Sequence, residues 1–130
     1  MLMKKSFFKS FTLFCLGFVF LTVSSCHKEG IGGGASISGT VYHHDDPIPN
    51  CVVYIKFNTT DFPGDSPSNY DSKVTADATG KFSFPKLYKG DYYLFGSGMD
   101  SKIQELVRGG VSIHLKHNKA YEQNVPVTED

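Results

Sequence analysis

After Ser36 the apolar residues recur at every second position, and this period restricts the fold more than any other feature. Between residues 51 and 57, for example, Cys51, Val53, Ile55 and Phe57 share one face of an extended chain. Turn-forming residues separate such runs, and no stretch repeats with the period of an α-helix. The fold class predicted from this pattern is all-β.

Seven short strands are expected. The first is expected to point Ile37, Gly39 and Val41 inward, and the second Cys51, Val53, Ile55 and Phe57. The fourth points Phe82 and Phe84 inward, the fifth Tyr92 and Leu94, and the sixth Val111, Ile113 and Leu115. The third strand spans residues 73 to 76 and the seventh residues 121 to 127. An earlier start of the sixth strand near Gln104 requires a bulge at Gly109-Gly110. Pro126 predicts that the seventh strand is a sheet edge. This number and spacing of strands indicates a β-sandwich.

The N-terminal segment reads as an export signal. Three lysines within the first nine residues precede a mostly apolar stretch from 11 to 23, which is shorter than the roughly 20 residues a membrane span needs. The stretch ends in V-S-S-C, which resembles the lipobox of bacterial lipoproteins. That resemblance implies cleavage after residue 25 and attachment of a diacylglycerol to Cys26. An ordinary secretory signal and an uncleaved anchor are the alternatives. His27, in place of an aspartate, favours the outer membrane among lipoproteins of this kind.

The net charge and the cysteines of the chain that remains after cleavage restrict its partners and its disulfides. Three of the 13 basic residues precede Cys26 and all 13 acidic residues follow it, so the mature chain carries 10 − 13 = −3 charges. Without a basic stripe we expect no nucleic-acid partner. Cys15 leaves with the signal and Cys26 is expected to carry lipid, so Cys51 has no disulfide partner.

Four blocks in the chain match one family in order and spacing. They read I-S-G-T-V, P-I-P-N-C-V-V, T-A-D-A-T-G-K-F-S-F-P-K-L and K-G-D-Y-Y-L, and they resemble the carboxypeptidase regulatory-like domain. The resemblance implies a seven-stranded, prealbumin-like Greek-key sandwich with no catalytic role. The expected layout is a signal peptide over 1–25, a lipidated cysteine and flexible glycine-rich linker over 26–35, and the domain over 36–128.

Metal and catalytic sites find little support in the sequence. His43-His44-Asp45-Asp46 gathers possible ligands, but adjacent histidines on an extended chain point to opposite faces. His114 and His117 diverge for the same reason. We therefore expect solvated histidines, no metal and no cofactor. Cys51 lies on the predicted buried face, which favours inert packing over nucleophilic chemistry. The prediction is that the protein is not an enzyme.

An aromatic surface is the stronger candidate site. Tyr54, Tyr93 and Phe95 fall on strand faces opposite the predicted core, where aromatic rings can stack on a sugar or anchor a protein. The loop from 58 to 72 contains Tyr70 and exceeds the usual length of a connection, and such loops are either functional or mobile. These four aromatic residues are the predicted ligand-binding set.

The predicted function follows from these features. We expect a non-catalytic module of the cell envelope, held on the membrane by its lipid, which mediates protein interaction or gives structural support. A surface module that binds carbohydrate or metal for nutrient capture is the alternative. The expected partners are the membrane, through the lipid, and an envelope protein or glycan.

Overall fold

The computed structural model describes residues 30 to 130, so the signal peptide and Cys26 lie outside the described residues. Nine strands and one short 3-10 helix form in order: β1 (Ile31–His43), β2 (Asp46–Pro47), β3 (Val52–Phe57), η1 (Pro67–Asn69), β4 (Ser72–Thr75), β5 (Lys81–Leu87), β6 (Gly90–Asp100), β7 (Glu105–Leu115), β8 (Ala120–Glu122) and β9 (Val125–Glu129). The predicted all-β class is confirmed. The strands number nine within this region because β2 was not foreseen and the predicted seventh strand is split into β8 and β9.

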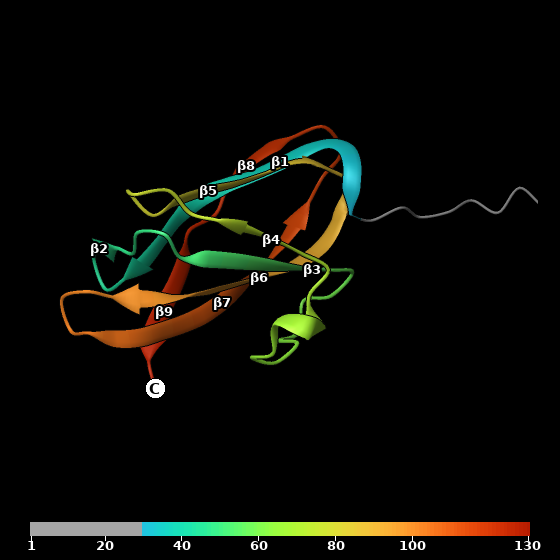
Figure 1. Ribbon diagram of the computed structural model, residues 1–130. Coiled ribbons are helices and arrows are strands. Elements are labelled where there is room, and N and C mark those ends of the chain that lie inside the picture. The colour runs from blue at the N-terminus through green and yellow to red at the C-terminus, as the bar shows by residue number, and fades with distance from the viewer. Residues whose placement is uncertain (1–29) are drawn as a thin grey trace, which may run out of the picture.

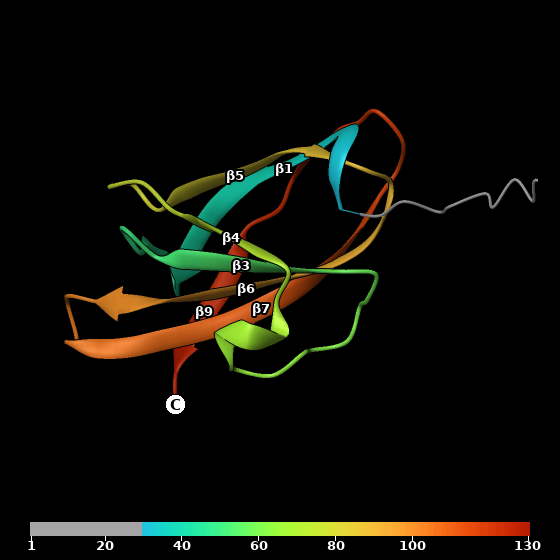
Figure 2. The same cartoon turned by 45° about the vertical axis from the view of Figure 1, so that its right-hand side comes forward.

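The strands form two layers (Figure 1). In one layer β4, β3, β6 and β7 pair antiparallel in that order. In the other, β1 pairs with β5 antiparallel and with β8 parallel. β9 pairs with β1 at Val41↔Val125 and with β7 at Val107↔Glu129, so it joins the layers along one side. The result is a β-sandwich with one closed side (Figure 2).

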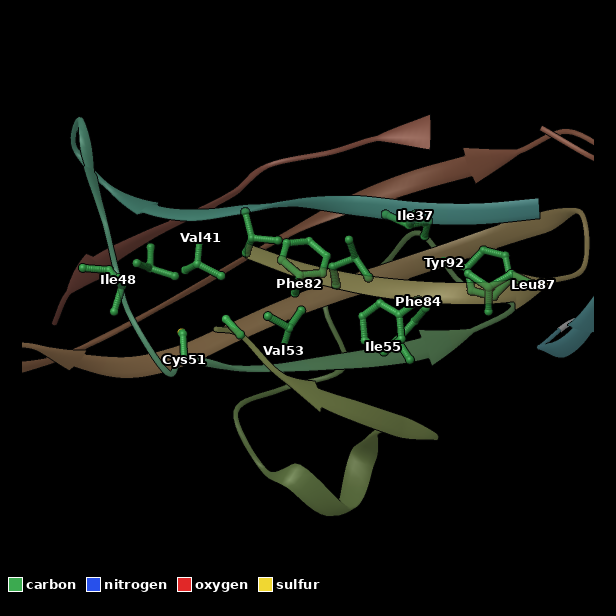
Figure 3. Packing of buried hydrophobic residues seen from close by; sticks show 14 of the residues in the cluster. Ile37, Val41, Ile48, Cys51, Val53, Ile55, Phe82, Phe84, Leu87 and Tyr92 are labelled. Atoms are coloured by element: carbon green, nitrogen blue, oxygen red, sulfur yellow. The ribbon is translucent and has the colours of Figure 1, made fainter. Parts of the chain in front are cut away.

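The core lies between the layers (Figure 3). The predicted inward faces of β1, β3 and β5 meet there. Ile37 and Val41 from β1, Val53 and Ile55 from β3, and Phe82 and Phe84 from β5 are each at most 5% exposed. Tyr92, Leu94 and Leu115 are also buried, whereas Val111 and Ile113 are partly buried against this cluster. The period of two thus predicted the inward residues correctly, because the core lies against one face of each of these strands.

The expected flexible linker is wrong for residues 31 to 35, which belong to β1. Ala35 is buried at 1% exposure, and Gly33 lies so close to β5 that a Cβ there would sit 2.2 Å from the carbonyl oxygen of Leu87. Glycine serves close packing here rather than flexibility.

Two further expectations about the late strands are wrong. β6 and β7 pair without a break from Gly90↔Leu115 to Asp100↔Glu105, so there is no bulge at Gly109-Gly110. Instead, Gly109 makes room for β9, since a Cβ there would lie 2.3 Å from the carbonyl oxygen of Pro126.

β9 is not an edge strand but lies between β1 and β7. Its pairs with β7 begin at Thr128, beyond Pro126, so the missing N–H of the proline costs that ladder nothing.

Candidate functional site

The outer face of β3, β6 and β7 carries an aromatic cluster. Tyr93 and Phe95 alternate with the buried Tyr92 and Leu94 of β6 and therefore point away from the core. Tyr54 of β3 lies directly opposite Phe95, with ring centroids 6.4 Å apart. The predicted outward register of these three aromatic residues is thus confirmed.

The loop between β3 and β4 covers this cluster. Tyr70 stacks on Phe95 at 5.6 Å and 15°, and Phe62 contacts Phe95 at 5.6 Å and Tyr93 at 5.8 Å. Phe95 is consequently only 3% exposed. All four predicted residues come together, but Phe95 lies beneath the others and presents no surface to a partner. Phe62 was missed, although a large apolar residue in a long polar loop could have indicated it.

Hydrogen bonds fix the shape of the loop and tie it to β3. The Oδ2 atom of Asp71 accepts from the backbone N–H of Phe57 at 2.7 Å, and the Tyr70 hydroxyl donates to the carbonyl of Gly64 at 2.8 Å. The side chain of Asn69 donates to the carbonyl of Pro63 at 2.8 Å. Burial raises the pKa of Tyr70 well above its usual value. The loop is therefore an ordered second layer on the sheet.

A shallow depression of about 260 Å³ lies beside the loop, between Phe62 and Tyr93 on one side and charged groups on the other. Its charged lining consists of Arg108, Asp65 and Asp130, and Arg108 forms ion pairs with both aspartates. Gly110 forms part of its lining next to the ring of Tyr93, since a Cβ at this position would lie 2.5 Å from that ring. Two aromatic rings, tilted by 46° to each other beside hydrogen-bonding groups, suit a polar ring or a peptide.

The same outer face continues into the hairpin between β6 and β7. Met99 and Leu106 are directly paired across that hairpin and are 55% and 47% exposed, and Ile103 in its turn is 44% exposed. Among the described residues five large apolar side chains are exposed, namely Ile31, Phe62, Met99, Ile103 and Leu106. Four of the five thus belong to the loop on this face or to the hairpin that extends it.

The histidines depart from expectation. His43 is not solvated but 5% exposed, with Nδ1 2.7 Å from Oδ2 of Asp100 and Nε2 2.5 Å from Oε2 of Glu129. The hydrogen bond between His43 and Asp100 raises the pKa of His43 and lowers the pKa of Asp100.

His44 does not diverge from His43 either, because its φ of 54° interrupts the alternation of the strand, and the two rings lie 4.4 Å apart. His114 is exposed, and its Nδ1 lies 2.7 Å from Asp91.

Cys51 is fully buried in the core, as predicted, and has no disulfide partner among residues 30 to 130. Burial raises the pKa of its thiol to about 11. A thiol of this kind is protonated near neutral pH and is therefore a poor nucleophile.

Within the described part of the chain, no helix has the length and apolar character to cross a bilayer.

Sequence comparison finds no matching protein-family model and no significantly similar curated protein. Three solved structures have a similar fold. A DUF3823 family protein from Parabacteroides merdae is 17% identical over 77% of this chain, with a TM-score of 0.47, and the match spans 48% of that protein, about half its length. A putative carbohydrate binding protein from Pseudomonas aeruginosa is 14% identical, with a TM-score of 0.47, over 75% of this chain and 91% of its own. The 5-hydroxyisourate hydrolase of Klebsiella pneumoniae is 10% identical, with a TM-score of 0.42, over 79% and 98%. At these identities and TM-scores, the similarities carry no inference about activity or ligand.

Proposed function

We propose that the protein is a lipid-anchored, non-catalytic binding module of the cell envelope that holds a protein partner on the outer face of β3, β6 and β7. The observation that carries this proposal is the gathering of exposed apolar side chains on that face and on the hairpin that extends it. Exposed large apolar side chains that gather on one face, with polar groups around them, are characteristic of interaction sites.

The residue types on this surface support a protein partner. The cores of protein interfaces are enriched in aromatic residues, methionine and arginine and depleted in lysine and acidic residues. Phe62, Tyr93, Met99 and Leu106 supply the apolar part, and Arg108 is a partly exposed arginine beside them. The resemblance to the carboxypeptidase regulatory-like domain, which no family model supports, implies a non-catalytic module and by itself no ligand.

The proposed anchor would place the hairpin part of this surface away from the membrane. β1 begins at one end of the sandwich, and the β6–β7 hairpin projects from the other end (Figures 1 and 2). The backbone N–H of Gly30 donates to the Tyr92 hydroxyl near the start of β6, and β6 then continues from Tyr92 to its end at Asp100, roughly 27 Å away, at the hairpin. The four peptide steps from Cys26 to Gly30 span at most roughly 14 Å. A partner would therefore meet the hairpin on the side remote from the bilayer.

Two experiments separate the anchor from the binding surface. Cys26→Ser should abolish acyl labelling and cause the uncleaved precursor to accumulate, and normal labelling would refute lipidation. For the surface, Leu106→Asp should reduce the yield of a crosslinked partner from whole cells, because it places a charge in the apolar contact. Ser83→Asp, on the exposed side of β5 in the other layer, is the matched control and should leave the yield unchanged.

A glycan is the second candidate ligand, and the depression beside Phe62 and Tyr93 favours it. A sugar ring could stack on Tyr93 while its hydroxyl groups bond to Arg108 and Asp65. On a glycan array, Tyr93→Ala would then abolish binding and Leu106→Asp would not. If the wild type binds no glycan, the protein partner is the only one of the two candidates that remains.

A further inference from the structure

Three strands end together at the end of the sandwich that carries the β6–β7 hairpin, opposite the end where β1 starts. His43 closes β1, Asp100 closes β6 and Glu129 closes β9, and His44 follows directly on β1. One ligand atom from each of His43, His44 and Glu129 lies within 4.8 Å of the others. Segments 86 residues apart in sequence thus bring two imidazoles and a carboxylate to one point.

The backbone at His44 is what makes the cluster possible. Its φ of 54° lies in the left-handed region, which histidine, like asparagine and aspartate, adopts more often than most residues other than glycine. In a regular strand its ring would face away from that of His43. Here the two rings are 4.4 Å apart, and that of His44 remains exposed at the surface.

Asp100 fixes the orientation of the buried imidazole. Its Oδ2 accepts from Nδ1 of His43 at 2.7 Å, and its Oδ1 accepts from the backbone N–H of Lys102 at 2.9 Å, so the carboxylate is held on both sides. Nε2 of His43 consequently points toward Glu129 and His44. A carboxylate behind the far nitrogen of a histidine is the usual outer support of a metal-binding imidazole.

The distances require only small adjustments to hold an ion. In a tetrahedral site with bonds near 2.0 to 2.1 Å, ligand atoms lie about 3.3 Å apart. The Nε2 of His43 and Oε2 of Glu129, now 2.5 Å apart, would separate by less than 1 Å, and His44 would move inward. Both moving side chains are exposed, whereas the buried His43 and Asp100 stay in place.

From this geometry we propose that His43, His44 and Glu129 bind a divalent transition-metal ion of the zinc type, with Asp100 as the positioning residue for His43. Two imidazoles and one carboxylate match the ligands that zinc takes when a fourth position is left to water. When the ion binds, it takes the place of the proton on Nε2 of His43, and that proton passes to the solvent. The site lies at the hairpin end of the sandwich, and none of its four residues belongs to the aromatic cluster of the outer face.

Zinc titration of the purified full-length protein tests the proposal directly. We expect one zinc ion per chain with micromolar or tighter affinity, measured by calorimetry and by metal analysis after dialysis. His44→Asn removes a ligand while retaining a residue that tolerates positive φ, and Glu129→Gln removes the carboxylate charge. Each should weaken binding at least tenfold. His114→Asn is the matched control, because His114 is exposed, as His44 is, but lies outside the cluster, and it should bind as the wild type does.

Cobalt substitution distinguishes ligation from a merely structural role. Bound cobalt(II) should show the visible absorption of a four-coordinate site, and His44→Asn should lose that band while its far-ultraviolet circular dichroism is unchanged. Asp100→Asn should weaken zinc binding by about 10- to 100-fold, the usual effect of an outer-shell substitution. A wild type that retains no zinc after dialysis, or a His44→Asn variant that binds like the wild type, would overturn the proposal and leave His43 as the centre of an ion-pair cluster.

Discussion

The imidazole of His43 and the carboxylate of Asp100 meet 2.7 Å apart although 57 residues separate them in the chain. His43 ends a strand of one layer and Asp100 ends a strand of the other, so this buried contact joins the two layers at the hairpin end. Removing the carboxylate leaves a buried imidazole nitrogen without its acceptor, which costs stability.

Asp100→Ala should therefore lower the melting temperature of the metal-free protein, measured by circular dichroism in the presence of a chelator. Asp46→Ala is the control, because Asp46 forms an exposed ion pair with Lys102, and exposed pairs contribute little. If both variants melt at the wild-type temperature, the His43–Asp100 contact does not stabilise the fold.

Phe82 and Phe84 should each be essential to the core. They are 5% and 4% exposed, and their rings meet edge to face at 6.1 Å. Truncation of a buried phenylalanine to alanine lowers the free energy of unfolding by roughly 3 to 5 kcal/mol. Urea denaturation should show this loss for either variant, whereas Ser83→Ala between them should have almost no effect because Ser83 is exposed. Unchanged urea midpoints would contradict the inward placement of β5.

Phe95 should behave as a core residue although it lies outside the main core. Because Tyr54, Phe62 and Tyr70 surround it, Phe95→Ala is expected to cost roughly 3 to 5 kcal/mol of unfolding free energy. Phe62→Ala should cost only about 1 kcal/mol, since Phe62 is 53% exposed and loses mainly ring contacts. Equal, small losses in urea denaturation would mean that the loop does not cover the sheet in solution.

Asp77 should make stability depend on acid pH. Its Oδ1 accepts from the hydroxyl and backbone N–H of Thr79 and from the backbone N–H of Lys81, and these bonds lower its pKa, the Thr79 hydroxyl most of all. The folded pKa lies below the unfolded value of about 3.9, so the contribution is complete above that value and disappears as the pH falls through the folded pKa. Asp77→Asn should be less stable than the wild type at pH 6, and the difference in urea midpoint should shrink toward pH 3. A constant difference would contradict this origin.

The sequence correctly predicted the residues whose placement depends on burial of one face of a strand. It missed the features that depend on the close approach of two backbones and on the packing of a loop. Val53, Phe82 and Leu94 could be assigned to the core because a strand with one buried face shows the period of two directly. Gly33 could not be read as part of a strand, because its role depends on the backbone of Leu87 more than fifty residues away.

The candidate sites show the same division. The outward direction of Tyr54 and Tyr93 followed from alternation, but the covering of Phe95 depends on how a long loop folds back, which no local pattern encodes. The meeting of His43 with His44 depends on one positive φ value, at a residue type for which that conformation is uncommon. The covering of Phe95 is thus a tertiary effect, whereas the meeting of the two histidines is a local exception to the alternation of a strand.

The central claim, that the outer face and its hairpin hold a protein partner, is tested most directly by site-specific photocrosslinking in living cells. A photoreactive phenylalanine analogue would be placed singly at Phe62, Met99 or Ser83 of the full-length protein. We predict adducts of one and the same mass from positions 62 and 99, none from position 83, and loss of both adducts when Leu106→Asp is added. Adducts from position 83 alone, or none from positions 62 and 99, would contradict the claim.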